Sequence, residues 1–229
     1  MTKPNAKPNT IVIIAGPSLT GKSKLSSLLV EQGFGALVST TTRKPREGEK
    51  DGQHYHFLTK EDFRAKLAKK GFIEHVEVDS RMQEIDGRLQ KIEGNFYGMS
   101  KDEVLKAFAA GKPVVVVCEP SGVKEIYKYA VGEGWNPVRV FLNNKPELLV
   151  QRFLERFKDD KRANPEQYAT RLLKMVTFER DHWIEPALKG VDQYEVVYPN
   201  FENENQLDVV KDLVGQVGLP YKAKRSPSC

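Results

Sequence analysis

The chain has 229 residues, a length that favours one domain carrying inserted subregions over two full domains. Hydrophobic residues make up 39% of the sequence and charged residues 29%, a balance that excludes a disordered chain and is typical of a folded protein. The net charge of +5 does not indicate nucleic-acid binding, because the 36 lysines and arginines are spread among 31 acidic residues without a sustained basic block.

Neither a membrane span nor a disulfide framework is predicted. The longest apolar stretches, residues 11–15 and 113–118, are far too short to cross a bilayer, and residues 1–10 lack the apolar core of a signal sequence. Two cysteines, Cys118 and Cys229, are too few and too poorly placed for a disulfide framework or a metal site, so both are expected to be free thiols. We therefore expect a cytoplasmic protein without a membrane partner.

Strand and helix patterns alternate along the chain. After a loose leader at residues 1–9, a β-branched run at residues 11–14 predicts a strand buried on both faces, and a glycine-rich turn leads to a helix with Leu25, Leu28 and Leu29 at helical spacing. Further strands are predicted at residues 113–117, 138–142 and 194–197. This order predicts an α/β fold with a doubly wound parallel sheet as its core.

A second region interrupts this alternation. Thr59 with Asp62, and Ser100 with Glu103, have the form of a capping box, so each pair predicts the start of a helix. Short alternating segments that predict a small antiparallel sheet lie at residues 54–58 and 72–78. We assign about residues 36–99 to an inserted substrate-binding region.

Two charged helices are predicted in the second half of the chain. The first carries Arg152 and Arg156, and a charged break at residues 159–165 separates it from a helix that contains Arg171. We predict that about residues 149–171 form a mobile helical lid.

The predicted domain spans residues 10–218. Its core is assigned to residues 10–35, 100–148 and 172–218. An apolar stripe near the end of the chain is predicted to pack in this core and comprises Leu207, Val210, Leu213, Val214 and Val217. Residues 219–229 form a basic tail, which we interpret as a solvated segment.

Residues 16–23 fit the pattern G-x-x-x-x-G-K-[ST] and lie between a buried strand and a helix. In this pattern, glycines let backbone N–H groups curl around phosphate oxygens, and the helix N-terminus adds positive potential. Lys22 can bridge the β- and γ-phosphates of ATP, and the Ser23 hydroxyl can hold Mg²⁺. The alternative, a glycine turn with a surface lysine, does not explain the strand before it and the helix after it. We predict ATP and Mg²⁺ as cofactors, with an ATP site made of Gly16, Pro17, Ser18, Leu19, Thr20, Gly21, Lys22 and Ser23.

A second cluster of polar residues lies between residues 39 and 57. Arg43 and Arg46, separated by Lys44 and Pro45, can clamp one phosphate with forked hydrogen bonds, and the Tyr55 hydroxyl can add a further donor. These residues indicate a grip for a monophosphate. An exposed basic hairpin is the alternative that these residues alone leave open.

Four segments carry a resemblance to a known family: residues 16–25, 39–57, 71–74 (Gly-Phe-Ile-Glu) and 94–98 (Gly-Asn-Phe-Tyr-Gly). In this order they resemble the successive motifs of guanylate kinases. The resemblance covers most of the chain and implies a P-loop NTPase fold with a core, a nucleoside-monophosphate-binding region and a lid. It also implies ATP-dependent phosphorylation of GMP or dGMP to GDP or dGDP, with Mg²⁺.

The resemblance also implies roles for individual residues. Residues that resemble those holding the acceptor phosphate are Arg43, Arg46, Tyr55 and Tyr97, and residues that resemble the base readers are Ser39 and Glu74. A carboxylate at Glu74 would accept hydrogen bonds from guanine N1–H and the 2-amino group, whereas adenine presents a lone pair at N1. Arg156 and Arg171 resemble lid arginines that reach the transferring phosphate. The catalytic set is therefore expected to be Lys22, Arg43, Arg156 and Arg171.

Three features depart from the family pattern. Met99 stands where a serine or threonine hydroxyl would reach the guanine edge, so one weak readout bond is expected to be missing. At the end of the strand at residues 114–117, the acidic pair is replaced by Val117 and Glu119, of which Glu119 is expected to face the acceptor ribose or the Mg²⁺ water shell. Residues 79–93 form a polar insertion before Gly94.

These departures keep other functions open. One is a kinase for a modified or different purine nucleotide, and a less favoured one is a kinase for a sugar phosphate. Another is a catalytically inactive guanylate-kinase-like binding module, which the intact Lys22 disfavours. We expect nucleotides, and neither nucleic acid nor a membrane, as partners, and a monomer or a homodimer as the working form.

Overall fold

The computed structural model describes residues 9–45, 48–78, 81–85, 88–158, 165–190, 192–199, 201–202 and 205–222. The predicted leader up to residue 8, the break at residues 159–164 and the tail from residue 223, with Cys229, lie outside these ranges. The chain folds into two compact units. We call Met1–Ala36 with Lys112–Cys229 the core unit, and Leu37–Gly111 the inserted unit.

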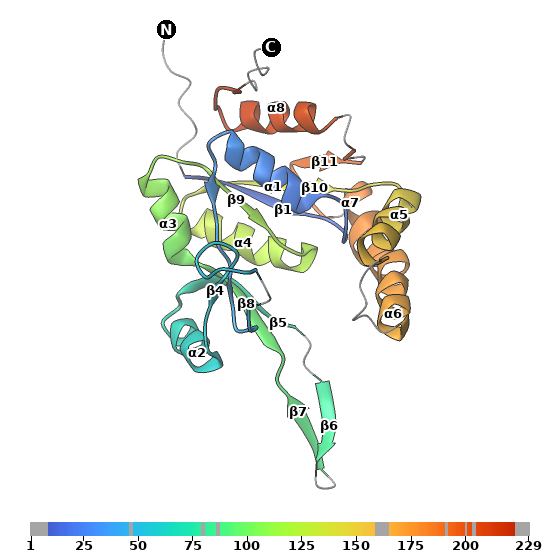
Figure 1. Ribbon diagram of the computed structural model, residues 1–229. Helices are drawn as coiled ribbons and strands as arrows, with labels where there is room; N and C mark the ends of the chain where they lie inside the picture. Colours follow the sequence, from blue (N-terminus) through green and yellow to red (C-terminus); the bar gives the residue numbers. More distant parts are fainter. Residues whose placement is uncertain are drawn as a thin grey trace. The chain divides into compact units, whose positions relative to one another are not determined.

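A five-stranded sheet with every neighbouring pair parallel forms the centre of the core unit (Figure 1). Its order is β11-β10-β1-β9-β2, with β1 at Thr10–Ala15, β2 at Gly35–Ala36, β9 at Val114–Val117, β10 at Asn136–Leu142 and β11 at Val196–Tyr198. The central strand β1 is buried along its whole length, because helices cover both faces of a parallel sheet. The predicted α/β core with a doubly wound parallel sheet is confirmed.

Helices α1 (Lys22–Glu31) and α8 (Gln206–Gln216) lie on one face of this sheet, and α4 (Pro120–Gly132) lies on the other (Figure 1). The apolar stripe predicted for α8 is mostly buried, but Leu207 is 51% exposed and Val209 takes its place in the core. Leu207 lies in the first turn, at the edge of the stripe that Val210 and Leu213 define, so its side chain turns to solvent.

Two further helices of the core unit pack against each other through Leu149, Phe153 and Met175. They are α5 (Pro146–Phe157) and α6 (Pro165–Val176), so the predicted end of the lid at residue 171 falls inside α6. A π-helical turn, η1 (Arg180–Ile184), and the short α7 (Glu185–Leu188) follow. In the described part of the chain, no helix combines the length and the apolar character that a membrane span requires.

The inserted unit contains a four-stranded sheet of order β4-β3-β8-β5. Its strands are β3 (Thr40–Thr41), β4 (His56–Phe57), β5 (Phe72–Val78) and β8 (Asn95–Ser100), and its helices are α2 (Lys60–Ala68) and α3 (Lys101–Ala109). The pairs β3·β8 and β5·β8 are antiparallel as predicted, whereas β3·β4 is parallel. The long connection of residues 42–55 returns the chain to the end of the sheet at which β3 began, so β4 runs in the same direction.

Helix α2 covers one face of this sheet through Phe63. Its ring stacks on Phe72 of β5 and on Phe96 of β8, with centroid distances of 4.3 and 5.4 Å. Since side chains alternate along a strand, Tyr97 and Met99 belong to the other face.

The side-chain cap predicted at Thr59 is confirmed, and the one predicted at Ser100 is wrong. The Asp62 N–H donates to Thr59 Oγ1 at 3.0 Å, and this hydroxyl donates to Asp62 Oδ2 at 2.7 Å. Ser100 Oγ makes no cap bond, because it accepts from the Lys66 ammonium at 2.7 Å. Both helices nevertheless begin at the predicted positions.

Replacing Thr59 by alanine is expected to destabilise the start of α2 by about 1 kcal/mol, the usual cost of losing a side-chain cap. The matched control is Ser100→Ala, at the start of α3, where the serine caps no helix. Hydrogen exchange of the Asp62 amide should accelerate in the Thr59→Ala variant, and unchanged exchange would contradict the assignment.

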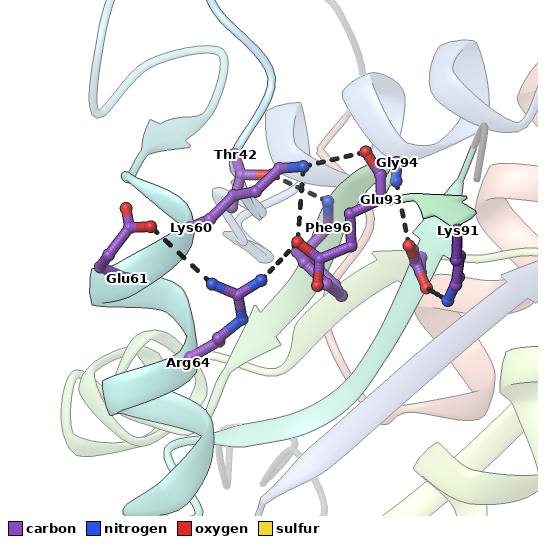
Figure 2. Close-up of polar contacts among 9 residues, drawn as sticks. Thr42, Lys60, Glu61, Arg64, Lys91, Glu93, Gly94 and Phe96 are labelled. Carbon is purple, nitrogen blue, oxygen red and sulfur yellow. Dashed lines mark hydrogen bonds and ion pairs between the residues drawn. The ribbon is translucent and has the colours of Figure 1, made fainter. Parts of the chain in front are cut away.

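Within the segment predicted to be an insertion, β6 (Arg81–Ile85) and β7 (Arg88–Ile92) form an antiparallel hairpin. Figure 2 shows the contacts at its base. Glu77 accepts from the Lys91 ammonium at 2.5 Å and from the Gly94 N–H at 3.0 Å, while Glu93 pairs with Arg64 on α2 and its carbonyl accepts from Lys60 at 2.9 Å. The base of the hairpin is thus bonded to both β5 and α2.

Candidate active site

The loop at residues 16–21 leaves β1 and enters α1, so the central strand of the core unit positions it. Gly16 has a φ of +146°, and a Cβ there would lie 2.1 Å from the Leu142 carbonyl oxygen. Gly21 has a φ of +97°, and a Cβ there would lie 2.9 Å from the Phe201 ring. Only glycine fits both places, which accounts for the two fixed glycines of the phosphate-loop pattern.

Lys22 turns its ammonium back over this loop. Nζ donates to the carbonyl oxygens of Gly16 and Pro17 at 2.9 and 2.7 Å. Burial lowers the pKa of Lys22 to about 8, and the negative charges of Glu179 and Glu119 oppose part of this shift. The loop therefore holds a cation whose solvation is incomplete, an arrangement suited to bind anionic phosphate oxygens.

Lys22 should make the stability of the protein rise with pH. The unfolded chain, with a lysine pKa near 10.5, binds more protons between pH 8 and 10.5 than the folded chain does. Over this range the free energy of unfolding should rise by up to about 3 kcal/mol from this group, since one pKa unit is worth about 1.4 kcal/mol. Urea unfolding of the wild type and of Lys22→Met at several pH values isolates this contribution. The same pH dependence in both proteins would contradict the assignment.

Two polar side chains keep the loop in shape. The Thr20 hydroxyl donates to the Pro17 carbonyl at 2.9 Å, and the buried Asn144 donates from Nδ2 to the Thr20 carbonyl at 3.1 Å. Asn144 Oδ1 also accepts from the Phe201 N–H at 2.8 Å. Asn144 was not predicted, because it follows β10 far along the sequence and only the parallel sheet brings it to the loop.

Glu179 is a second functional candidate that the sequence did not reveal. Its side chain is 3% exposed, and its carboxylate accepts from the Ser18 N–H at 3.0 Å and from the Ser18 hydroxyl at 3.2 Å. In the sequence it is one acid in a charged helical segment, without a motif to distinguish it. Only the tertiary structure places this carboxylate beside the phosphate loop and near Lys22.

The other predicted residues of the core unit are placed by their elements. Ser23 lies in the first turn of α1 with its side chain exposed, and the exposed Glu119 is the N-cap residue of α4, near enough for its charge to act on Lys22. Arg156 lies on α5 and Arg171 on α6, and the positions of these two side chains are outside the described part of the structure.

In the inserted unit, three predicted phosphate-binding residues come together. The Arg43 guanidinium lies 5.4 Å from the Tyr55 ring centre, and the Tyr55 and Tyr97 rings meet edge to face at 6.0 Å. Glu49 accepts two parallel hydrogen bonds from Arg43, both of 2.9 Å, and with Tyr97 it raises the arginine pKa. The Glu49 carboxylate thus shows that the Arg43 fork is oriented to hold an oxyanion.

Glu74 and Met99 lie directly opposite each other on β5 and β8. Opposed residues of an antiparallel pair project from the same face, and alternation adds Tyr97 to that face, which is the one that α2 does not cover. Met99 is 5% exposed, so the residue opposite Glu74 in this strand pair is buried. The carboxylate predicted to read the base and the tyrosine of the phosphate grip therefore share one face of the sheet.

For two further predicted residues of the inserted unit, the structure gives no side-chain contact to this cluster. Arg46 lies outside the described residues. Ser39 lies just before β3, and its carbonyl oxygen accepts from the His56 N–H at 2.9 Å. This bond aligns β3 with β4 and assigns no role to the Ser39 hydroxyl.

The chain is similar to known proteins in both sequence and fold. The sequence profile named Guanylate kinase matches residues 8–185. The guanylate kinase of Clostridium perfringens strain SM101 is 35% identical over 164 residues, which are 70% of this chain and 66%, just under two thirds, of that protein. The guanylate kinase of Synechococcus is 33% identical over 73% of this chain and 81% of its own length, and that of Dechloromonas aromatica is 29% identical over 94% and 93%.

A solved structure shares the fold. The crystal structure of guanylate kinase from Anaplasma phagocytophilum superposes with a TM-score of 0.60 at 22% identity, over 93% of this chain and 88% of that one. The profile match extends over most of the chain, from residue 8, just before β1, to residue 185, where α7 begins, and this chain belongs to the guanylate kinase family.

Proposed function

We propose that the protein transfers the γ-phosphoryl group of ATP to GMP or dGMP, giving ADP with GDP or dGDP. The observation that carries this proposal is the shared sheet face of Glu74 and Tyr97, with Arg43 and Tyr55 beside Tyr97. A grip for one oxyanion next to a carboxylate acceptor matches a guanine nucleotide monophosphate, whose base presents two donors on one edge. Family membership and the phosphate loop support the same reaction.

In this proposal each unit binds one substrate. The phosphate loop holds the ATP phosphates, and Lys22 exchanges its bonds to Gly16 and Pro17 for bonds to phosphate oxygens. Arg43 exchanges Glu49 for the acceptor phosphate, and Arg46, Tyr55 and Tyr97 complete the grip. Ser39 and Glu74 read the base.

The residues near the phosphate loop also fit Mg²⁺. The ion prefers hard oxygen donors. The exposed hydroxyl of Ser23 follows Lys22 directly in the sequence, and the exposed carboxylate of Glu119 is close enough for its charge to act on Lys22. We propose that Ser23 holds the ion, with Glu119 at its water shell or at the acceptor ribose. When bound, Mg²⁺ neutralises charge on the β- and γ-phosphates.

Positioning and electrostatics would supply most of the catalysis, since phosphoryl transfer proceeds through a loose transition state with charge spread over its equatorial oxygens. We propose that Lys22, Arg43, Arg156 and Arg171 neutralise this charge. We propose the cytoplasm as the place of this reaction.

The test is ADP release with ATP and Mg²⁺ against GMP, dGMP, AMP, dAMP, dTMP, CMP and the 2-aminoadenine deoxynucleotide. GMP and dGMP should be preferred to the adenine nucleotides by about 100-fold or more in kcat/KM, because a site built for two donors leaves its acceptor unpaired with adenine. Preference for another acceptor, or no ADP release with any of them, would reject the proposal.

A further inference from the structure

Leu19 has an unusual backbone conformation for its residue type. Its φ is +66°, in the left-handed region that glycine enters freely and that strains a residue with a Cβ. It lies in the middle of the phosphate loop, between Ser18 and Thr20. A leucine kept in this conformation needs contacts that outweigh the strain.

The leucine side chain has such contacts in the core unit. It packs against the apolar cluster in which Leu149 and Phe153 of α5 meet Met175 of α6. The Leu19 carbonyl oxygen also accepts from the Arg152 guanidinium of α5 at 3.0 Å. Side chain and backbone of one loop residue are therefore attached to the same pair of helices.

The neighbouring residue, Ser18, is also bonded to this helical part of the core unit. Ser18 donates both its N–H and its hydroxyl to the buried Glu179, in the segment that directly follows α6. Thr20, by contrast, is held by Pro17 and Asn144, next to the central sheet. Residues 18 and 19 are thus fixed to α5 and to the segment that follows α6, whereas residue 20 is fixed beside the sheet.

We propose that Leu19 is a positioning residue that couples the phosphate loop to α5 and α6, so that nucleotide bound at the loop orders these two helices. The proposal rests on the proposed function, because it takes ATP or ADP as the ligand of the loop. The strain supplies the mechanism. Without the leucine anchor, the backbone at residue 19 is free to relax, and a change at the loop no longer reaches the cluster around Phe153.

Three variants separate the anchor from the strain. Leu19→Ala removes the anchor and keeps the strained residue type, Leu19→Gly removes both, and Leu19→Met retains a long apolar side chain. Val217→Ala, a truncation in the core around α8, controls for general destabilisation.

The measurement is hydrogen exchange of residues 146–157 and 165–176, with and without Mg²⁺–ADP at saturating concentration. In the wild type, ADP should slow exchange in both helices. In Leu19→Ala and Leu19→Gly this protection should be at least threefold weaker, while Leu19→Met and Val217→Ala should keep it. In steady-state kinetics the first two variants should raise KM for ATP about tenfold and change kcat less, since the anchor acts on binding geometry.

The outcomes distinguish this inference from the proposed function. Absence of ADP protection at the loop of the wild type, together with no turnover, rejects the proposed function and the inference with it. Protection of α5 and α6 that is equal in the wild type and in Leu19→Ala rejects the inference alone. Loss of protection in Val217→Ala to the same extent rejects it too, because general loosening would then explain the result.

Discussion

Replacing Lys22 by methionine is expected to lower kcat by about 100- to 1,000-fold, the cost of removing one preorganised charge from a transition state. Methionine keeps the length and apolar character of the lysine stem, so the phosphate loop should retain its fold. The loss of kcat is expected because the Lys22 ammonium, which hydrogen-bonds to the carbonyl oxygens of Gly16 and Pro17, lies over the loop that would hold the phosphates. Initial rates of ADP release with GMP as acceptor measure the effect.

The matched control for this variant is Lys24→Met. Lys24 is an exposed lysine on the same helix, two residues further along the chain. It should change kcat by less than about twofold, as expected of a surface position away from the site. A Lys22→Met enzyme altered only in KM would show that Lys22 contributes uniform binding and no transition-state stabilisation.

Replacing Glu74 by glutamine is expected to lower kcat/KM for GMP by about 100-fold, since two hydrogen bonds to a charged acceptor weaken and one amide N–H opposes guanine N1–H. The change keeps the size of the side chain and its place on β5. Activity with AMP should stay equal or rise, because the amide can donate to the adenine N1 lone pair. The ratio of kcat/KM values for GMP and AMP measures this switch.

Glu77→Gln serves as the control on the same strand. Glu77 lies on the other face of β5, where it accepts from Lys91 and Gly94, and a glutamine keeps an acceptor for the second of these bonds. Its selectivity should match that of the wild type. If both variants lose preference for GMP equally, the base is read elsewhere and the effect belongs to the strand as a whole.

The parts of the fold that could be predicted from sequence are those whose cause is local. The β-branched run of β1, the positive φ angles of the loop glycines and the cap at Thr59 act over a few residues, so their sequence patterns determine them, although the close approach of Leu142 and Phe201 to these glycines is tertiary. Glu179 and Asn144 could not be predicted, because each reaches the loop only through the folded sheet and helices.

The same distinction explains the two differences in the inserted unit. The Ser100 pattern predicts a cap, but the Ser100 hydroxyl accepts a hydrogen bond from the Lys66 ammonium of α2, and this tertiary contact replaces the cap. The direction of β4 depends on the path of residues 42–55, which no periodicity encodes.

The hairpin of β6 and β7 has a consequence for the behaviour of the protein in solution. In the described part of the chain, these two strands pair only with each other, so each has one edge whose N–H and C=O groups could join a strand of another molecule. Arg81, Glu84, Arg88 and Lys91 place charges of both signs along them. Charged edge strands resist edge-to-edge association, so we expect the charges on this hairpin to disfavour aggregation through its open edges.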